Sequence, residues 1–235
     1  MQYEATANDA QLGSQPRSIP YYLTETYWWA YVHPGAVRVF ERQWLVNLIL
    51  WGNFALLRDA ALDELGPVIQ GRTLQIACVY GDFSLRLAER IAPAGSLDVV
   101  DVLPIQLQNL RRKLPVSARV RLLERDSTAL GFADGSYDQA ILFFLLHEQP
   151  AAVRKQTVAE AIRVVRPGGK LVVVDYHQPL KMHPLRYVLP PVLRTLEPYA
   201  LDLWDDDNID KCLADVAVRR KTFYGGLYQQ LVIAV

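Results

Sequence analysis

Two short segments of this sequence pair an imidazole with a carboxylate, the side chains that bind divalent metal ions and transfer protons. His147 and Glu148 follow the apolar run SYDQAILFF, and Asp175 and His177 end and follow the run GKLVVVDY. Carboxylate and imidazole are accepted as ligands by several divalent metals. Each pair also has a structural interpretation: the first as a helix-capping turn, the second as a loop with a surface histidine. The sequence leaves both interpretations open.

A third carboxylate has the position of a ribose ligand. Asp101 ends the apolar run GSLDVVDV, about twenty residues after the turn TLQIACVYGD, which spans Thr73 to Asp82. At this distance from a strand-to-helix turn, a carboxylate can accept hydrogen bonds from both ribose hydroxyls of a nucleotide. The alternative is that Asp101 caps the helix expected to begin at Pro104.

Composition limits the class of protein. The 235 residues suffice for one large domain, about half of them are apolar, and the formal net charge is zero. A neutral chain has no overall basic field, so we expect no nucleic-acid partner. The cysteines, Cys78 and Cys212, are far apart and indicate a reducing compartment. The sequence shows no secretory signal and no apolar run of membrane-spanning length, so we expect a cytoplasmic protein, soluble or peripheral to a membrane.

The elements that must position these side chains alternate between strands and helices. Apolar strand-like runs separated by amphipathic segments predict crossover units and a mostly parallel sheet. Near the end, two strand-like runs flank Gly225 and Gly226, which predicts an antiparallel hairpin. The expected fold is therefore α/β, a Rossmann-like, seven-stranded, mostly parallel sheet that ends in an antiparallel hairpin. The predicted helices cover Asp82 to Ile91, Pro104 to Leu114 and Pro150 to Val165; the predicted strands are RTLQIACV, GSLDVVDV, ARVRLLE, SYDQAILFF, GKLVVVDY, DVAVRRKTFY and LYQQLVIAV.

Residues 71 to 176 resemble class I S-adenosylmethionine (SAM) methyltransferases. The segments carrying the resemblance are the turn TLQIACVYGD, the segment around Phe132 and Asp138, and RVVRPGGKLVVVD, where Gly168 and Gly169 are expected to reverse the chain with positive φ. The resemblance implies the strand order 3-2-1-4-5-7-6, and it places Asp126 near the adenine amino group, although an Asx turn is the alternative for Asp126. The implied cofactor-binding residues are Ala77, Val79, Tyr80, Gly81, Asp101, Val102, Asp126 and Ser127.

The nucleotide turn departs from the methyltransferase pattern. Gln75 stands where an acidic residue is usual, Ala77 and Val79 stand on glycine positions, and Tyr80 is large. Together with LTETYWWAYVHPGAV, VVDVLPIQLQNLRRKLP, LFFLLHEQP and VDYHQP, this turn resembles the RquA family of rhodoquinone-biosynthesis enzymes, from about Tyr21 to Trp204. That family is related to the quinone methyltransferases.

The second resemblance implies a reaction and a metal. Ubiquinone would be converted to rhodoquinone by replacing a ring methoxy group with an amino group, with SAM as amino donor and manganese(II) as the metal. Catalytic roles would then fall on Tyr80, His147 and His177, and metal binding on His147, Glu148, Asp175 and His177. His33 and His183 are further metal candidates that are more simply explained as structural histidines.

The domain organisation follows from the same pattern. We expect a mobile tail over residues 1–18, an aromatic helical lid or substrate region over 19–70, and a SAM-binding domain over 71–235 with a helical insertion at about 182–213, all in one compact domain. Pro34 is expected to begin a helix after a break at His33. The lid and insertion provide apolar surface for a quinone and for peripheral contact with the inner membrane, where Arg186 and Arg194 could meet lipid phosphates.

Two rival functions remain open at this stage. The first is a conventional SAM-dependent methyltransferase acting on a quinone or another small molecule. The second is an inactive SAM-binding scaffold, for which loss of the turn glycines would be expected but retention of Asp101 and Asp126 would not. The oligomeric state is not predicted.

Overall fold

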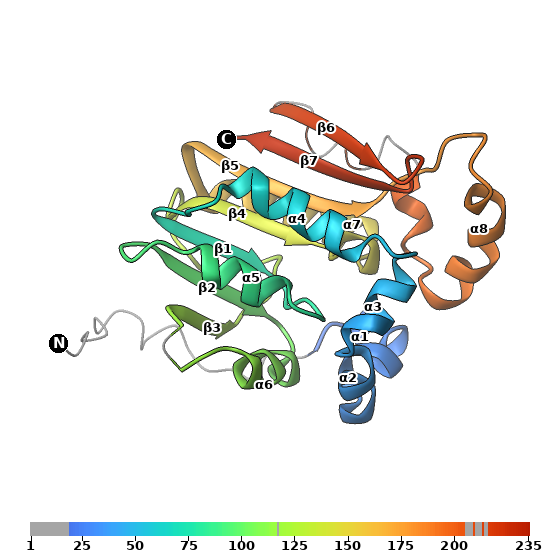
Figure 1. Ribbon diagram of the computed structural model, residues 1–235, viewed down its shortest axis with the longest axis horizontal. Helices are drawn as coiled ribbons and strands as arrows, with labels where there is room; N and C mark the ends of the chain where they lie inside the picture. Colours follow the sequence, from blue (N-terminus) through green and yellow to red (C-terminus); the bar gives the residue numbers. More distant parts are fainter. Residues whose placement is uncertain (1–18, 117, 205–208, 210–212, 214–215) are drawn as a thin grey trace.

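The computed structural model describes residues 19–116, 118–204, 209, 213 and 216–235. The predicted tail over residues 1–18 and the predicted position of Cys212 lie outside the described residues. Figure 1 shows a twisted sheet with helices packed on it and a group of short helices at the end where the parallel strands finish.

The described strands form one seven-stranded sheet in the order β3-β2-β1-β4-β5-β7-β6. β1 to β5 pair in parallel, whereas β7 is antiparallel to both β5 and β6. The predicted fold class and strand order are therefore confirmed. The strands are β1 (Arg72–Ile76), β2 (Ser96–Asp101), β3 (Val120–Glu124), β4 (Tyr137–Phe143), β5 (Val165–Tyr176), β6 (Ala217–Phe223) and β7 (Tyr228–Ala234).

The central strands are parallel because crossover helices connect them, and these helices cover both faces of the sheet. Residues of β1, β2 and β4 are almost all buried, as the unbroken apolar runs predicted. The chain winds outward from β1 in one direction and from β4 in the other, so right-handed crossovers put α5 and α7 on opposite faces. The strand order thus reverses between β1 and β4, where α/β sheets bind ligands. The crossover helices are α5 (Phe83–Arg90), α6 (Pro104–Lys113) and α7 (Ala151–Val164), with the short 3-10 helix η2 (Leu146–Glu148) before α7.

The glycines at two chain reversals, Gly168–Gly169 and Gly225–Gly226, differ in backbone conformation. Gly168 has φ of +77°, as predicted, but Gly169 does not have positive φ. Gly169 is needed for space instead, because a Cβ atom there would lie 2.6 Å from the Asp138 carbonyl oxygen. In the β6–β7 hairpin both Gly225 and Gly226 have positive φ, so that turn is built as predicted.

The N-terminal region is helical, as its periodicity predicted. Pro34 occupies the first turn of α2, and the His33 ring accepts a hydrogen bond from the Gly35 amide at the N-cap. The longest helix of this region, α4, packs against β5 and lies in front of the sheet in Figure 1. The elements are α1 (Tyr21–Glu25), the π-helix η1 (Trp28–Val32), α2 (Pro34–Phe40), α3 (Gln43–Ile49) and α4 (Phe54–Leu65).

The insertion before the hairpin contains α8 (Leu185–Leu196) and the 3-10 helix η3 (Leu201–Trp204). Leu185, Leu189 and Leu193 are buried and attach α8 to the core. Among the described helices, no single one has the length and hydropathy to cross a membrane; only α3 and α4 together pass that test, and the pair is bent by 94°.

Candidate functional site

A cleft lies at the carboxyl ends of β1, β2 and β4, beneath the N-terminal helices. Its cavity volume is about 60 Å³, which is smaller than the several hundred Å³ usual for ligand pockets. The segment from Pro20 to Tyr31 closes one side, so entry of a nucleotide-sized ligand requires this lid to move. The cleft is lined by Pro20, Tyr22, Leu23, Tyr31, Ile76, Ala77, Cys78, Tyr80, Val100, Asp101, Val102, Leu103, Gln106, Arg125, Asp126, Ser127, Phe144, Leu145, Glu148 and Gln149.

The turn after β1 has an unusual backbone conformation. Ala77 has φ of +72°, a left-handed conformation that costs a residue with a Cβ about 1 kcal/mol or more. Gly81 also has positive φ, and a Cβ there would lie 3.0 Å from the Phe54 ring. The chain therefore keeps the glycine-type geometry of a nucleotide-binding turn at Ala77 without the glycine. Of the predicted turn residues, Ala77 and Tyr80 line the cleft, while Val79 and Gly81 are not among its lining residues.

Asp101 lies at the end of β2 with its carboxylate fixed by the backbone. Oδ2 accepts a hydrogen bond from the Cys78 amide and Oδ1 accepts one from the Leu103 amide, both at 2.8 Å. Burial raises the pKa of Asp101 to about 6, although these hydrogen bonds act to lower it. An ionised carboxylate has capacity for about four hydrogen bonds, so Asp101 can still accept ribose hydroxyls.

Asp126 and Ser127 form the next wall of the cleft. Oδ1 of Asp126 accepts hydrogen bonds from the Thr128 amide and hydroxyl at 2.8 and 2.7 Å, so the Asx turn considered from the sequence is present. The turn does not remove Asp126 from the cleft, because Asp126 remains a lining residue. The Ser127 hydroxyl is within 2.8 Å of Thr157 and accepts from the Gln149 amide. These contacts hold Asp126 and Ser127 beside Asp101.

Tyr80 connects the nucleotide turn to the lid. Its hydroxyl donates to the Ala30 carbonyl at 2.9 Å and accepts from the Gln106 amide at 2.8 Å. Its ring stacks on Tyr31 at 5.7 Å and on Phe40 at 6.1 Å between centroids. Burial raises the pKa of Tyr80 above its usual range, so the phenol stays protonated near neutral pH. The geometry gives this residue, predicted as catalytic, a role in holding the lid.

His147 is the centre of a buried charge cluster. Nδ1 lies 2.9 Å from Asp175 Oδ1, and Nε2 lies 3.0 Å from Glu197 Oε2 and 3.8 Å from Glu148 Oε1. The Nδ1 and Glu197 oxygen atoms have no hydrogen bond of good geometry, so these contacts are ion pairs more than directed hydrogen bonds. Burial alone would lower the pKa of His147, but the carboxylates Asp175 and Glu197 raise it well above its usual range. The surrounding carboxylates therefore favour the protonated form of His147.

Glu148 is the member of this cluster that faces the cleft. It is buried and lines the cleft together with Tyr31 of the lid. Burial raises its pKa to about 8, although the charge of His147 lowers it. A carboxyl group that is neutral near pH 7 and lies in a cleft can donate or accept a proton. The helix-capping interpretation of His147 and Glu148 is not supported, because neither η2 nor α7 has a side-chain hydrogen bond at its N-cap.

His177 is separate from the cleft. Its Nδ1 lies 2.7 Å from the Gly226 carbonyl in the β6–β7 hairpin, and it is not among the residues that line the cleft. The prediction that it joins His147 in catalysis or metal binding is not supported by this placement. His33 caps α2, and the ring of His183 packs on Tyr224 and accepts from the Leu185 amide, so both are structural, as the simpler interpretation held.

Glu197 and Arg154 were missed from the sequence. Arg154, on α7, is fully buried and donates to the carbonyls of Leu146, Gln149 and Tyr199 at 2.9–3.0 Å. It therefore ties the segment carrying His147 to the insertion that carries Glu197. The sequence offers one signal for Glu197: it is a single acidic residue at the end of a helical stretch that contains no other acidic residue.

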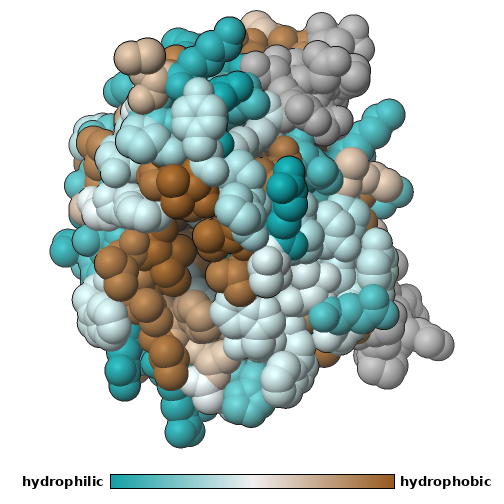
Figure 2. All heavy atoms as spheres, turned by 90° about the vertical axis from the view of Figure 1, so that its right-hand side faces the viewer, coloured by the Kyte–Doolittle hydropathy of each residue, from teal (hydrophilic) through white to brown (hydrophobic). Residues whose placement is uncertain are grey.

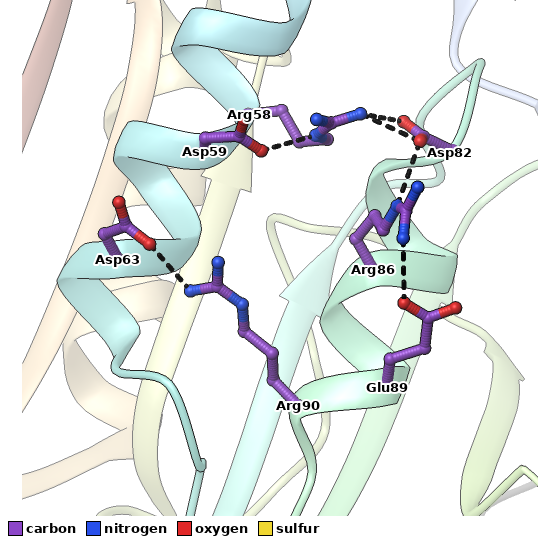
Figure 3. Close-up of polar contacts among 7 residues, drawn as sticks. All are labelled: Arg58, Asp59, Asp63, Asp82, Arg86, Glu89 and Arg90. Atoms are coloured by element: carbon purple, nitrogen blue, oxygen red, sulfur yellow. Dashed lines mark hydrogen bonds and ion pairs between the residues drawn. The ribbon is translucent and has the colours of Figure 1, made fainter.

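A second recess lies between α4 and α5 and is lined by charges of both signs (Figure 3). Arg58 donates to both oxygens of Asp82 at 2.8 Å, and Arg86 contacts Asp82 and Glu89. Because these positive and negative side chains pair with one another, the recess has no excess charge of one sign that would attract a ligand. Its ion pairs join α4 to α5 and to the nucleotide turn. It anchors Asp82, the last residue of the nucleotide turn, to α4.

Comparison with known proteins agrees with this geometry. Residues 73–169 match the methyltransferase domain family. The solved structures that superpose on the chain include a SAM-dependent methyltransferase from Aquifex aeolicus (TM-score 0.59, 16% identity, 86% of this chain and 99% of that one). An O-methyltransferase family protein from Burkholderia thailandensis superposes with a TM-score of 0.63 at 17% identity, over 85% of this chain and 59% of that one. This chain has the class I SAM-methyltransferase fold.

Two curated relatives are named for quinone substrates. A ubiquinone/menaquinone biosynthesis C-methyltransferase, UbiE, from Dinoroseobacter shibae is 32% identical over 134 residues, 56% of this chain and 53% of that protein. A demethylmenaquinone methyltransferase from Thermus thermophilus is 37% identical over 138 residues, 58% of this chain and 61% of that protein. The chain thus spans between half and two thirds of these relatives' lengths. The matches support a SAM-dependent transferase of the methyltransferase type.

Proposed function

We propose that this protein is a SAM-dependent transferase that acts on a quinone ring. The observation that carries the proposal is the cleft itself, which combines a buried carboxylate at the end of β2 with an aromatic lid. Asp101 would accept the ribose hydroxyls, and Asp126 would lie near the adenine. The lid residues Tyr22, Leu23 and Tyr31 would enclose an apolar ring and exclude water. The names of the relatives support a quinone as the substrate class.

Within this class, we propose that the reaction is the amination of ubiquinone to rhodoquinone. The ring carbon would form a bond to the SAM amino nitrogen and lose its bond to the methoxy oxygen, which leaves as methanol with one proton from the amine. Release of rhodoquinone would then break the bond between that nitrogen and Cα of the methionine arm: the bonding pair stays on nitrogen, a proton from Cβ passes to it, and the arm leaves as an α,β-unsaturated carboxylate. The amine must be neutral to attack. Gln75 is uncharged where an acid is usual, and its amide already donates to the Ala77 carbonyl at 2.9 Å, so the turn stabilises an ammonium group less.

The resemblance to the rhodoquinone enzymes implies manganese(II). Among the described residues, no group of three or more His, Cys, Asp or Glu side chains is arranged as a ready metal site. The donor set around Nε2 of His147, with Glu148 and Glu197, nevertheless has the chemistry that manganese accepts, provided that the metal displaces the proton on Nε2, and Asp175 on Nδ1 would orient the ring. When bound, the metal would supply Lewis-acid polarisation of a quinone carbonyl. The proposed metal ligands therefore differ from the predicted set. Glu197 is added, Asp175 orients the His147 ring and does not bind the metal, and His177 is no longer a ligand.

A second candidate, methyl transfer to a quinone, is favoured by the relatives' names. Two SAM preparations distinguish the candidates, one labelled at the methionine nitrogen and one at the methyl carbon. Each is incubated with protein, manganese and ubiquinone or its demethylated precursor, and the quinones are examined by mass spectrometry. We expect the nitrogen label in the product and no methyl label; methyl label alone would establish the methyltransferase instead. Failure of SAM to bind in calorimetry would exclude both reactions and the SAM-binding scaffold alike.

A further inference from the structure

Helix α3 is apolar but contacts the core only through the half-buried Val46. Its sequence, QWLVNLI, has no charged residue, yet none of its residues is buried. Trp44 and Leu48 have 61% and 65% of their surface exposed, and Trp51, just after the helix, is exposed with φ of +52°. A helix that is apolar but not buried against its own core needs another apolar environment.

Helix α8 carries a second exposed apolar strip. Val188, Val192 and Leu196 follow at steps of four residues, so they share one side of the helix, and all three are exposed. The leucines that hold α8 on the core occupy a neighbouring strip. Both helices lie at the end of the molecule where the parallel strands finish (Figure 1). Figure 2 looks onto this end and shows hydrophobic side chains gathered around a hollow. The α3–α8 surface is defined by Trp44, Leu48, Ile49, Val188, Val192 and Leu196.

The charges around the α3–α8 surface are mostly of one sign. Residues 28–51 and 180–196 contain basic side chains and a single acidic one, Glu41, in a chain of net charge zero. Glu41 is occupied by an ion pair with Lys113 at 2.7 Å and by Asn109. The surface therefore presents apolar side chains within a positive field. The basic residues are Arg38, Arg42, Lys181, Arg186 and Arg194.

We propose that the α3–α8 surface docks on an anionic phospholipid bilayer. Exposed tryptophan and tyrosine suit the boundary between headgroups and acyl chains, and lysine and arginine suit anionic headgroups. The helices are too short to cross the bilayer, so they lie in its interface. A protein partner is less favoured than a bilayer. The core of a protein interface is poor in charged residues, but nothing about such an interface requires positive charges around it, whereas an anionic bilayer does.

Docking in this orientation would bring the lid to the membrane. The π-helix η1 contacts α2, which contacts α3, and its Trp28 and Trp29 are also exposed. A substrate dissolved in the bilayer could then reach the cleft without crossing water. This consequence rests on the proposed function, whereas docking itself does not require any quinone.

Flotation with vesicles tests the surface directly, with the full chain and without SAM or quinone. Vesicles contain phosphatidylcholine alone or phosphatidylcholine with phosphatidylglycerol. We compare wild type with Trp44→Ser/Leu48→Ser, Val188→Ser/Val192→Ser and Lys181→Gln/Arg194→Gln. The matched controls are Val68→Ser, an exposed apolar residue outside the surface, and Arg111→Gln/Arg112→Gln on α6. All substituted side chains are exposed, so thermal unfolding should be unchanged and confirms that each variant folds.

We expect wild type and both controls to float with the anionic vesicles and to be released by salt. Each surface variant should lose at least about tenfold in vesicle affinity. Equal binding to neutral and anionic vesicles, or equal binding by the surface variants and the controls, would overturn the proposal. So would dimerisation of wild type in solution that the same variants abolish, because the surface would then be an interface between copies of this chain.

Discussion

The hydroxyl of Tyr80, in the turn after β1, donates a hydrogen bond to the carbonyl of Ala30 in the lid, at 2.9 Å. The two residues are 50 positions apart in the chain, and their contact closes the cleft. Gln106 reinforces it by donating its amide to both the Tyr80 hydroxyl and the Tyr31 carbonyl. The large residue in the nucleotide turn therefore has a structural consequence: it couples the cofactor-binding turn to the segment that covers it.

Removing the hydroxyl of Tyr80 should loosen the lid. Tyr80→Phe keeps the ring stacking on Tyr31 and Phe40 but leaves the Ala30 carbonyl and the Gln106 amide with one partner fewer. We expect the free energy of unfolding to fall by about 1 kcal/mol. Amide hydrogen exchange over residues 28–32 should accelerate more than exchange in β1. Tyr187→Phe is the control, because its hydroxyl also donates to a carbonyl, that of Lys181, but at an exposed site. If amide exchange over residues 28–32 is equally fast in Tyr80→Phe and Tyr187→Phe, the Tyr80 hydroxyl does not hold the lid in place.

SAM affinity should depend on the ionisation of Asp101. Its pKa of about 6 means that roughly nine tenths of the carboxylate is ionised at pH 7 and roughly one tenth at pH 5. Because the ionised form accepts ribose hydroxyls more strongly, the dissociation constant for SAM should rise about tenfold between pH 7 and pH 5. Calorimetry measures it. Asp101→Ala should weaken binding at least about tenfold at pH 7 and flatten the pH profile.

The same pKa predicts the opposite trend in stability. The folded-state pKa of Asp101 lies above its unfolded value of 3.8, so burial favours the protonated form. The ligand-free protein should therefore lose stability from this residue as pH rises from about 4 to about 6, and stay level above that. Asp101→Asn should lack this contribution. If denaturant unfolding of wild type and Asp101→Asn shows the same pH trend, the Asp101 carboxyl is not buried as described.

Strain at Ala77 should be removable. Its φ of +72° is one that glycine adopts freely, so Ala77→Gly should leave stability unchanged or raise it by up to about 1 kcal/mol. Gly81→Ala provides the contrast, since it places a Cβ in a left-handed conformation and 3.0 Å from Phe54. That variant should lose about 1–2 kcal/mol. Urea denaturation distinguishes them, and a loss of stability in Ala77→Gly would show that the turn is not left-handed.

Manganese binding tests the cluster around His147 without any turnover. Titration of manganese(II) followed by electron paramagnetic resonance should show one tight site, and Glu197→Gln should weaken it at least about tenfold. Glu25→Gln, an exposed carboxylate on α1, is the control and should bind as wild type does. Binding that is equally tight in Glu197→Gln would exclude Glu197 as a ligand. The absence of binding in wild type would leave the cluster as a set of ion pairs.

The sequence by itself determined the fold and the nucleotide end of the site. Alternating apolar strands and helices dictate a parallel sheet with helices on both faces, and the carboxyl ends of parallel strands meet at one edge. Asp101 and Asp126 follow such strands, so their meeting in one cleft is a consequence of local pattern and strand order. The same holds for His147 and Glu148, which follow β4, and for the hairpin, whose glycines take the positive φ that its turn requires.

Only the tertiary structure decided which side chains from distant segments meet. Glu197 reaches His147 across 50 residues because Arg154 holds the insertion against η2, and no period or motif encodes that contact. His177 follows a strand, as Asp101 does, but the antiparallel hairpin gives its ring a carbonyl partner at Gly226. Tyr80 is a second example. A large aromatic residue in the sequence marks the nucleotide turn as unusual, but its contact with the lid depends on where η1 packs. Local sequence fixes backbone direction and burial, whereas contacts between segments depend on how the whole chain packs.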